Sequence, residues 1–281
     1  MNATEIIYRL PGRFVGFRPG AHRGKGTGEG YLFRHLAPFL ARPDPRRLDL
    51  RASLVDPFGN LKVRIQEQPT TLKVFALLDL SGSMAFRGNF PKAAVMGDFV
   101  EALATAAHKI GDTLGVYGAA EQILPELSYG STRWPGSGRR VAARLRRTQP
   151  CGVGCQGLFN AARQLPVRSS LVVVLSDFHM PLAAIKALLD ALSAHWVVPV
   201  VIWDDQEALP APVGLARLLD AETGGERLLL IRPGLRERLS TNLEQRKERL
   251  LELFRRHGRP PLILNRGFCA QAVNRYFLAP T

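Results

Sequence analysis

Asp79, Ser81 and Ser83 occupy alternate positions of a short polar stretch, and their oxygens could together bind a divalent cation. The stretch follows the apolar run 72–78, which is typical of a buried strand. A carboxylate and two hydroxyls in one turn can converge on a point, and such oxygen ligands suit Mg²⁺ or Mn²⁺. Gly82 lets the backbone turn closely between the two serines. The pattern indicates a metal site, and the alternative interpretation is that these side chains only cap the following helix.

A second carboxylate stands after another apolar run. Residues 169–175 include the stretch LVVVL, and Ser176 and Asp177 follow it directly. In a parallel sheet, ligands bind in the crevice beyond the carboxyl ends of the strands. We therefore expect Asp177 to lie beside Asp79 and to complete the ligand set. His179 is expected to neighbour the site and to donate a hydrogen bond to one of its carboxylates.

Positioning these strand ends requires a layered sheet, and the pattern from residue 71 onward predicts one. Strands are expected at the short apolar runs, over residues 72–79, 112–119, 169–177, 196–203 and 227–231. Helices are expected where apolar residues recur at helical spacing, over residues 91–110, 141–147, 156–165, 180–195 and 236–257. Val- and Leu-rich strands that alternate with helices indicate an α/β fold with a mostly parallel sheet flanked by helices.

The first 70 residues have a different character, with many arginines and glycines. Short strands are expected there over residues 48–55 and 61–65, and a helix only around residues 31–40. We therefore expect residues 1–70 to form an N-terminal extension and residues 71–281 to form the main domain.

The chain carries a formal net charge of +14, and the positive charge is unevenly distributed. Residues 127–176 contain eight arginines and no carboxylate. Such a face attracts an acidic protein, anionic lipid or nucleic acid, and we expect Arg139, Arg140 and Arg144 to contact the partner. The sequence has no helix-turn-helix pattern, zinc finger or RNA-binding aromatic signature. A nucleic-acid-binding module is therefore the alternative and not the main hypothesis.

Several functional classes are disfavoured by what the sequence lacks. No apolar run approaches the roughly 18 residues that a membrane-spanning helix needs, and the first residues do not resemble a secretory signal. The cysteines Cys151, Cys155 and Cys269 make no disulfide framework and fit a reducing compartment, so we expect a cytoplasmic protein. The G-x-S-x-G turn of serine hydrolases and a phosphate-binding glycine loop are both absent, so we expect no enzymatic activity.

Two segments together resemble a known family. LLDLSGSM over residues 77–84 and VVVLSDF over residues 172–178 are similar to the metal-ion-dependent adhesion site of von Willebrand factor A domains. Arg47–Leu50 and the strand after it resemble the region that precedes this motif in the MoxR-associated branch of the family. That branch includes the MxaS-like proteins of methanol-oxidation gene clusters. The resemblance covers the chain from about Gly20 to the C-terminal helix.

The resemblance implies a von Willebrand factor A-like, cytoplasmic and non-enzymatic domain that acts with a MoxR-type AAA+ ATPase in maturing other proteins, often by metal or cofactor insertion. Carried over residue by residue, it implies that Asp79, Ser81, Ser83 and Asp177 form the metal site. An open coordination position would then accept an aspartate or glutamate from an acidic client protein.

The sequence departs from this family at one ligand position. The family has a threonine in a Gly-Thr turn, whereas this chain reads CGVGCQGLF over residues 151–159, with Cys155 or Gln156 at that place. A thiol is a poor ligand for Mg²⁺. The departure leaves three expectations open: a weakened site, a site completed by water, or a site completed by an oxygen of the partner.

Overall fold

The computed structural model describes residues 5–8, 22–86, 88–152, 154–208, 214–219 and 225–279. These residues form two compact units, one within Leu10–Leu72 and one that contains the residues from Lys73 onward together with residues 5–8. The division expected between residues 70 and 71 lies two residues before this boundary. Residues 5–8, which were expected in the N-terminal extension, belong to the larger unit instead.

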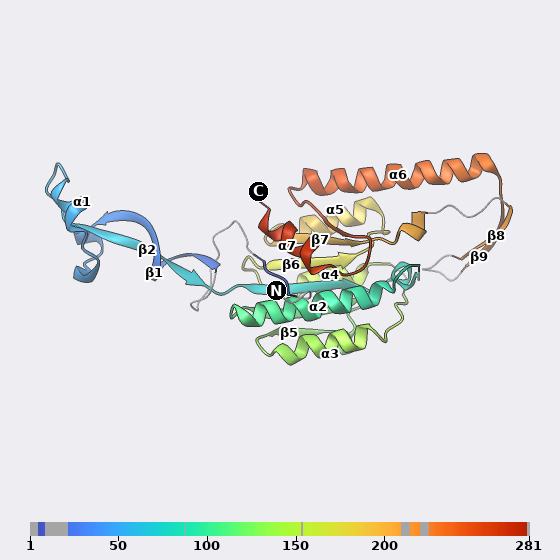
Figure 1. Cartoon of the computed structure of the whole chain (residues 1–281), viewed down its shortest axis with the longest axis horizontal. Helices are drawn as coiled ribbons and strands as arrows, with labels where there is room; N and C mark the ends of the chain where they lie inside the picture. Colours follow the sequence, from blue (N-terminus) through green and yellow to red (C-terminus); the bar gives the residue numbers. More distant parts are fainter. Residues whose placement is uncertain are drawn as a thin grey trace. The chain divides into compact units, whose positions relative to one another are not determined.

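The larger unit is built on a six-stranded sheet in the order β10-β7-β6-β3-β4-β5 (Figure 1). Its strands are β3 (Lys73–Asp79), β4 (Thr113–Ala119), β5 (Tyr129–Thr132), β6 (Leu171–Ser176), β7 (Trp196–Ile202) and β10 (Leu262–Leu264). All neighbouring pairs are parallel except β4 and β5, which are antiparallel. The predicted α/β fold with a mostly parallel sheet is therefore confirmed.

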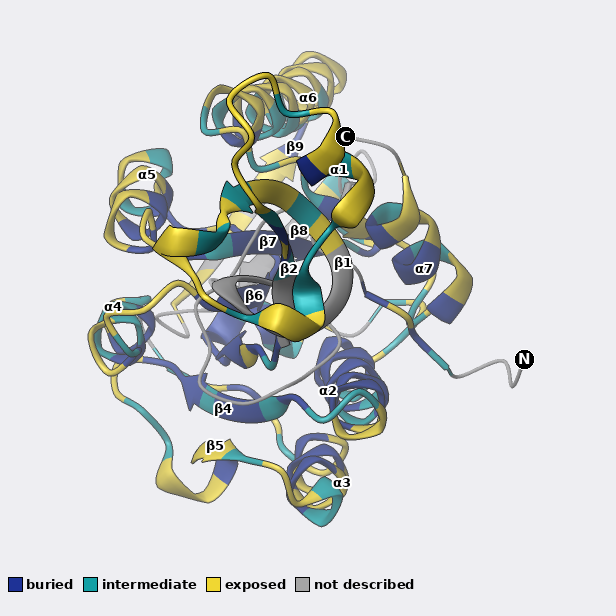
Figure 2. Cartoon of the chain, turned by 90° about the vertical axis from the view of Figure 1, so that its left-hand side faces the viewer, coloured by how far each residue is buried: buried dark blue, intermediate teal, exposed yellow. Residues whose placement is uncertain are grey.

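Helices cover both faces of this sheet (Figure 2). They are α2 (Lys92–Lys109), α3 (Pro135–Leu145), α4 (Gln156–Arg163), α5 (Leu182–Ala191), α6 (Pro233–Arg256) and α7 (Ala270–Leu278). Helices α4 and α5 lie on one face, and α2 and α7 lie on the other. Leu250 and Phe254 of α6 belong to the same buried cluster as residues of α4 and α5, so α6 covers their face. None of the helices in the described part of the chain is long and apolar enough to cross a membrane.

The two central strands carry the site, and both are deeply buried. β6 is buried along its whole length, and β3 is buried except at its first residue. Helices cover both faces, which explains why residues 74–78 and 171–175 are continuously apolar and do not alternate with polar residues. Leu78 pairs with Leu175 in parallel register, so β3 and β6 end side by side. Asp79 and Ser176 therefore stand at the same edge of the sheet.

The strand predicted over residues 227–231 does not join the central sheet. β9 (Glu226–Ile231) pairs antiparallel with β8 (Gly214–Leu219) in a separate two-stranded sheet. A short connection allows only antiparallel pairing of consecutive strands, whereas parallel pairing needs a longer crossover such as a helix. β10 follows the long helix α6 and joins the central sheet beside β7, a strand that was not expected.

The smaller unit contains β1 (His22–Pro38), which pairs antiparallel with β2 (Lys62–Thr70), and the helices η1 (Phe39–Ala41), η2 (Pro45–Arg47) and α1 (Leu50–Leu54). Two expectations here were wrong, because residues 31–38 form a strand and residues 50–54 form a helix. The carboxylate of Asp49 accepts a hydrogen bond from the N–H of Ala52 at 3.0 Å and so caps α1. This cap, and not the alternation of apolar residues, decides the local structure.

Candidate functional site

The buried carboxylate of Asp79 is the first part of a site at this sheet edge. Its Oδ1 accepts a hydrogen bond from the N–H of Ser81 at 3.0 Å, and its Oδ2 accepts one from the hydroxyl of Ser176 at 2.5 Å. Burial and the negative charge of Asp177 raise the pKa of Asp79 to about 6, although both hydrogen bonds act in the opposite direction. The two donors also fix the orientation of the carboxylate.

Three further oxygens lie next to one another in front of this carboxylate. The hydroxyl oxygens of Ser81 and Ser83 are 3.2 Å apart, and Ser83 Oγ donates a hydrogen bond to Asp177 Oδ1 at 3.1 Å. Neighbouring ligands of an octahedral Mg²⁺ with bonds of about 2.1 Å are separated by about 3 Å. The residues therefore fit Mg²⁺ or Mn²⁺ at this point, with Asp79 in contact with Ser81.

The two turns that carry these oxygens are held by the backbone. The N–H of Gly82 donates to the carbonyl of Gly152 at 3.0 Å. After β6, Phe178 has a positive φ of 55°, and its N–H donates to Ser176 Oγ at 2.8 Å. A non-glycine residue in the left-handed region is uncommon and is often found at functional sites. Here it turns the chain directly after Asp177.

Two charged residues that the sequence analysis did not select complete the site. Lys92, at the start of α2, is buried, and its Nζ lies 2.7 Å from Asp177 Oδ2 and 2.5 Å from Glu207 Oε1. Glu207 belongs to η5 (Asp205–Ala208), the 3-10 helix that follows β7. Lysine is almost never fully buried unless it is paired. The position of Lys92 in a helical sequence pattern therefore gave no reason to expect it in the site.

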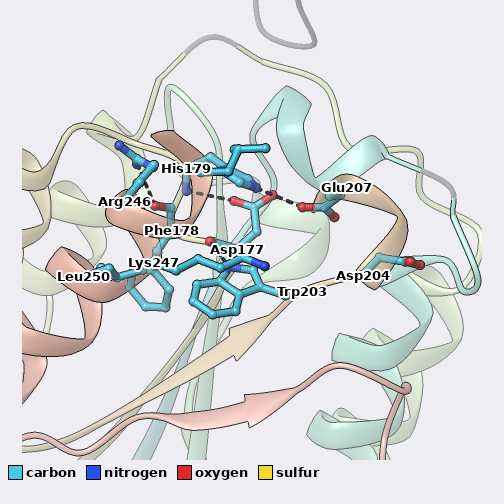
Figure 3. A pocket seen from close by; sticks show the side chains of 10 residues that line it. Asp177, Phe178, His179, Trp203, Asp204, Glu207, Arg246, Lys247 and Leu250 are labelled. Carbon is cyan, nitrogen blue, oxygen red and sulfur yellow. Dashed lines mark hydrogen bonds and ion pairs between the residues drawn. The ribbon is translucent and has the colours of Figure 1, made fainter. Parts of the chain in front are cut away.

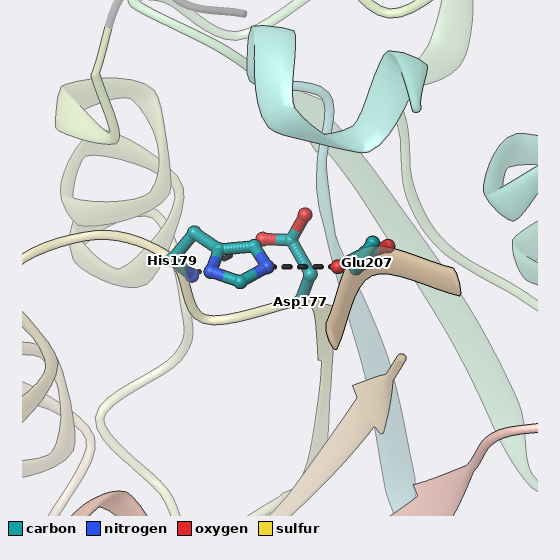
Figure 4. Close-up of side chains that lie close together, drawn as sticks. All are labelled: Asp177, His179 and Glu207. Atoms are coloured by element: carbon teal, nitrogen blue, oxygen red, sulfur yellow. Dashed lines mark hydrogen bonds and ion pairs between the residues drawn. The ribbon is translucent and has the colours of Figure 1, made fainter. Parts of the chain in front are cut away.

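His179 lies beside the site, and its ring contacts a carboxylate that was not expected there (Figure 4). Its Nε2 is 2.9 Å from Glu207 Oε2, and its backbone N–H donates to Asp177 Oδ1 at 3.1 Å. One ligand atom from each of these three side chains lies within 4.8 Å of the others. The carboxyl edge of the sheet therefore gathers more polar groups than the motif alone predicts.

A pocket opens next to these side chains, between the end of β6 and helix α6 (Figure 3). It is lined in part by Trp203, whose Nε1 donates to the carbonyl of Asp177 at 2.9 Å. The Nζ of Lys247 lies over the Trp203 ring, 5.3 Å from its centre. Arg246 donates to two backbone carbonyls just after β6, at 3.0 and 2.7 Å. The pocket therefore combines an aromatic wall with two basic side chains and with the carboxylates of Asp177, Asp204 and Glu207.

Cys155 and Gln156, the two residues that the resemblance offers for the threonine position, stand at the start of α4, with Cys155 immediately before it. Cys155 is the N-cap residue of this helix and packs, partly exposed, against the core. The loop before it reaches the site, since the carbonyl of Gly152 accepts the hydrogen bond from Gly82. The turn that departs from the family pattern therefore lies beside the serine turn.

The three arginines expected to contact a partner lie exposed on α3, which packs against α2. A Cβ atom at Gly138 would lie 2.2 Å from the Cβ of Ala104, which is in the half of α2 remote from Lys92. Arg139 and Arg140 follow Gly138 directly and so do not border the oxygen cluster. Arg139 and Arg140 are therefore separate from the oxygen cluster within the larger unit.

Two of the three arginines expected to contact a partner already have contacts within the chain. The guanidinium of Arg144 donates to the carbonyl of Glu126, and the guanidinium of Arg140 lies 5.6 Å from the centre of the Trp134 ring. Trp134, which immediately precedes α3, is itself exposed. An exposed indole beside an arginine offers a stacking surface.

Comparison with known proteins identifies a family. The family described as "Protein of unknown function DUF58" matches residues 46–249. The chain belongs to the DUF58 family. A relative from Paracoccus denitrificans, named "Uncharacterized protein in moxR 3'region", is 36% identical over 102 residues, which cover 36% of this chain and 97% of that protein. In this DUF58 protein the matched residues include every member of the oxygen cluster, together with Lys92 and Glu207.

Two solved structures are similar at lower identity. One is an aerotolerance-related membrane protein from Bacteroides fragilis, 13% identical, with a TM-score of 0.44 over 73% of this chain and 96% of that chain. The other is the conserved hypothetical protein BatB from Bacteroides thetaiotaomicron, 12% identical, with a TM-score of 0.43 over 73% of this chain and 95% of that chain.

Proposed function

We propose that this DUF58 protein is a cytoplasmic, non-enzymatic interaction domain with a von Willebrand factor A-like fold and a divalent-cation site of the metal-ion-dependent adhesion type. The observation that supports it is the cluster of Ser81 Oγ, Ser83 Oγ and Asp177 Oδ1, with separations of 3.2 and 3.1 Å. Ser81 and Ser83 would hold Mg²⁺ or Mn²⁺ directly, and Asp79 and Asp177 would hold it mostly through water.

When bound, the ion supplies positive charge and an open coordination position for a carboxylate of an acidic partner. The residues of the chain prepare that position. Asp79 orients the serine turn through the N–H of Ser81, and Ser176 orients Asp79. Lys247 and Arg246, in the wall of the adjoining pocket, attract the incoming carboxylate.

We further propose that the protein acts with a MoxR-type AAA+ ATPase in the maturation of a client enzyme, by metal or cofactor insertion. The support is the relative whose name places it in the moxR 3′ region, together with the sequence resemblance to the MoxR-associated branch. The client is proposed to be acidic, in keeping with the net charge of +14 of this chain. Methanol dehydrogenase is the client that the MxaS-like resemblance favours.

Calorimetry with Mg²⁺ and Mn²⁺ tests the metal site. We expect the wild type to bind one ion and Asp79→Ala to lose binding while keeping its circular dichroism spectrum. Asp190→Ala is the matched control, because Asp190 is an exposed carboxylate of α5. Absence of binding in the wild type, or unchanged binding in a folded Asp79→Ala protein, would contradict the proposal.

A nucleic-acid-binding module is the second candidate, and the exposed Trp134 beside Arg140 is the observation that favours it. It predicts binding to single-stranded nucleic acid that falls steeply between low and moderate salt. Substituting both Arg139→Glu and Arg140→Glu would abolish that binding and leave Mn²⁺ binding unchanged. Weak binding without a salt dependence would remove this candidate.

A further inference from the structure

Lys92 is an unusual residue, because its side chain is fully buried at the start of helix α2. Its Nζ lies 2.7 Å from Asp177 Oδ2, 2.5 Å from Glu207 Oε1 and 3.3 Å from the carbonyl oxygen of Ser83. An ammonium group without solvent is tolerated only where negative groups surround it. These three oxygens provide such surroundings.

The ammonium of Lys92 shares its partners with the ion proposed above. Asp177 offers Oδ1 to the hydroxyl of Ser83 and Oδ2 to Lys92, and Lys92 also contacts the backbone of Ser83. Both Asp177 and Ser83 belong to the oxygen cluster that fits Mg²⁺. A divalent ion bound there would meet a positive charge already paired with one of its own ligands, and the two cations would repel each other.

Glu207 is a second ion-pair partner of Lys92, beside Asp177. Its Oε1 is as close to Nζ as a hydrogen-bonded atom would be, and its Oε2 contacts His179 at 2.9 Å. The carboxylate is therefore anchored from the other side and forms an ion pair with the ammonium that does not involve Asp177. Lys92 could leave Asp177 without entering solvent.

We propose that Lys92 is a resident cation of this site that competes with a divalent ion for Asp177. The Lys92–Asp177 ion pair and the metal-bound state are alternatives, and binding of the ion moves the ammonium onto Glu207. The inference rests on the metal site proposed above and adds its regulation. Metal affinity in the wild type is accordingly low, since each binding event must first break a buried ion pair.

Calorimetric titration with Mn²⁺ of the purified chain tests this competition. We expect Lys92→Met to bind Mn²⁺ at least about tenfold more tightly than the wild type, since it removes a contact charge. Lys186→Met is the matched control, because it removes one positive charge from an exposed lysine of α5 that lies outside the site. Its affinity is expected to change by less than about threefold, as for an exposed charge.

A second variant separates competition from a simple change in charge and also covers a failure of Lys92→Met to fold. The double substitution Lys92→Met with Glu207→Gln removes one positive and one negative charge, so the net charge of the site stays as in the wild type. Under competition this variant still binds Mn²⁺ more tightly than the wild type, because Asp177 is released. Equal or weaker binding by a folded double variant would overturn the inference.

The outcomes distinguish this inference from the proposed function. Wild-type binding that Asp79→Ala abolishes, without tighter binding in the double variant, retains the metal site and overturns the competition. Binding by the Lys92 variants but not by the wild type supports the competition and overturns metal-dependent recognition by the unmodified chain. Absence of binding in all variants overturns both.

Discussion

At the carboxyl end of β6, the hydroxyl of Ser176 joins the two halves of the site. It donates to Asp79 Oδ2 at 2.5 Å and accepts from the N–H of Phe178 at 2.8 Å. We expect Ser176→Ala to lower the free energy of unfolding by about 1–3 kcal/mol, because a buried carboxylate oxygen and a buried N–H lose their partner. Mn²⁺ affinity is also expected to fall, because Asp79 is no longer oriented.

Chemical denaturation and Mn²⁺ titration together measure both effects of Ser176→Ala. Ser193→Ala is the control, since Ser193 is exposed in the turn after α5. A Ser176→Ala protein with the stability of the wild type would show that this hydroxyl does not hold Asp79 in place.

Some residues of the site could be predicted from the sequence, and others could not. Asp79 and Asp177 each follow a continuous apolar run. The rule that ligands bind beyond the carboxyl ends of parallel strands was therefore sufficient to predict that the two carboxylates lie at the same edge of the sheet. Lys92 stands in an amphipathic helix pattern in which lysine is ordinarily exposed. Glu207 lies in the short 3-10 helix η5 after β7, where the sequence has no periodic pattern of apolar residues. Only the tertiary arrangement brings their charges to Asp177.

Helices α2 and α3 pack closely because a glycine faces an alanine between them. A Cβ at Gly138 would lie 2.2 Å from the Cβ of Ala104, well inside contact distance. We expect Gly138→Ala to separate the helices and to lower the free energy of unfolding by about 1–3 kcal/mol, as overpacking commonly does. Gly234→Ala is the control, because nothing lies within 4 Å of a Cβ at that helical position.

Thermal and urea unfolding of the two alanine variants give the comparison. The control is expected to equal the wild type or exceed it by up to about 1 kcal/mol, because alanine favours helix more than glycine does. Equal stability of Gly138→Ala and Gly234→Ala would contradict the close packing of α2 on α3.

Among the secondary-structure elements, the strands that are buried on both faces could be predicted from the sequence. Residues 74–78 of β3 and 171–175 of β6 are continuously apolar, and the two strands were predicted for that reason. β10 contains only Leu262–Leu264, which is too short to stand out as a run. In the smaller unit, Asp49 caps α1 within a stretch whose alternation suggests a strand. Pairing partners and caps depend on contacts that a pattern of hydrophobicity does not contain.

In the larger unit as a whole, the beginning of the chain is fixed to its end. The N–H of Ile7 donates to Asn274 Oδ1 at 2.6 Å, and Asn274 Nδ2 donates to the carbonyl of Glu5 at 3.0 Å. The hydroxyl of Tyr8 donates to the buried carboxylate of Asp112 at 2.7 Å. Residues 5–8 thus complete a unit whose other residues begin only at Lys73.

Removal of residues 1–8 is therefore expected to destabilise the larger unit, although the sequence places these residues next to the smaller one. Tyr8→Phe isolates one contact and is expected to lower the free energy of unfolding by about 1–3 kcal/mol, since the buried Asp112 loses a donor. Hydrogen exchange of β3, β4 and α7 measures the effect on the larger unit directly. Exchange of β1 and β2 serves as the internal control, because the smaller unit makes none of these contacts. Faster exchange confined to β1 and β2 would mean that residues 5–8 stabilise the smaller unit instead, and the assignment of the chain's first residues would then have to be reversed.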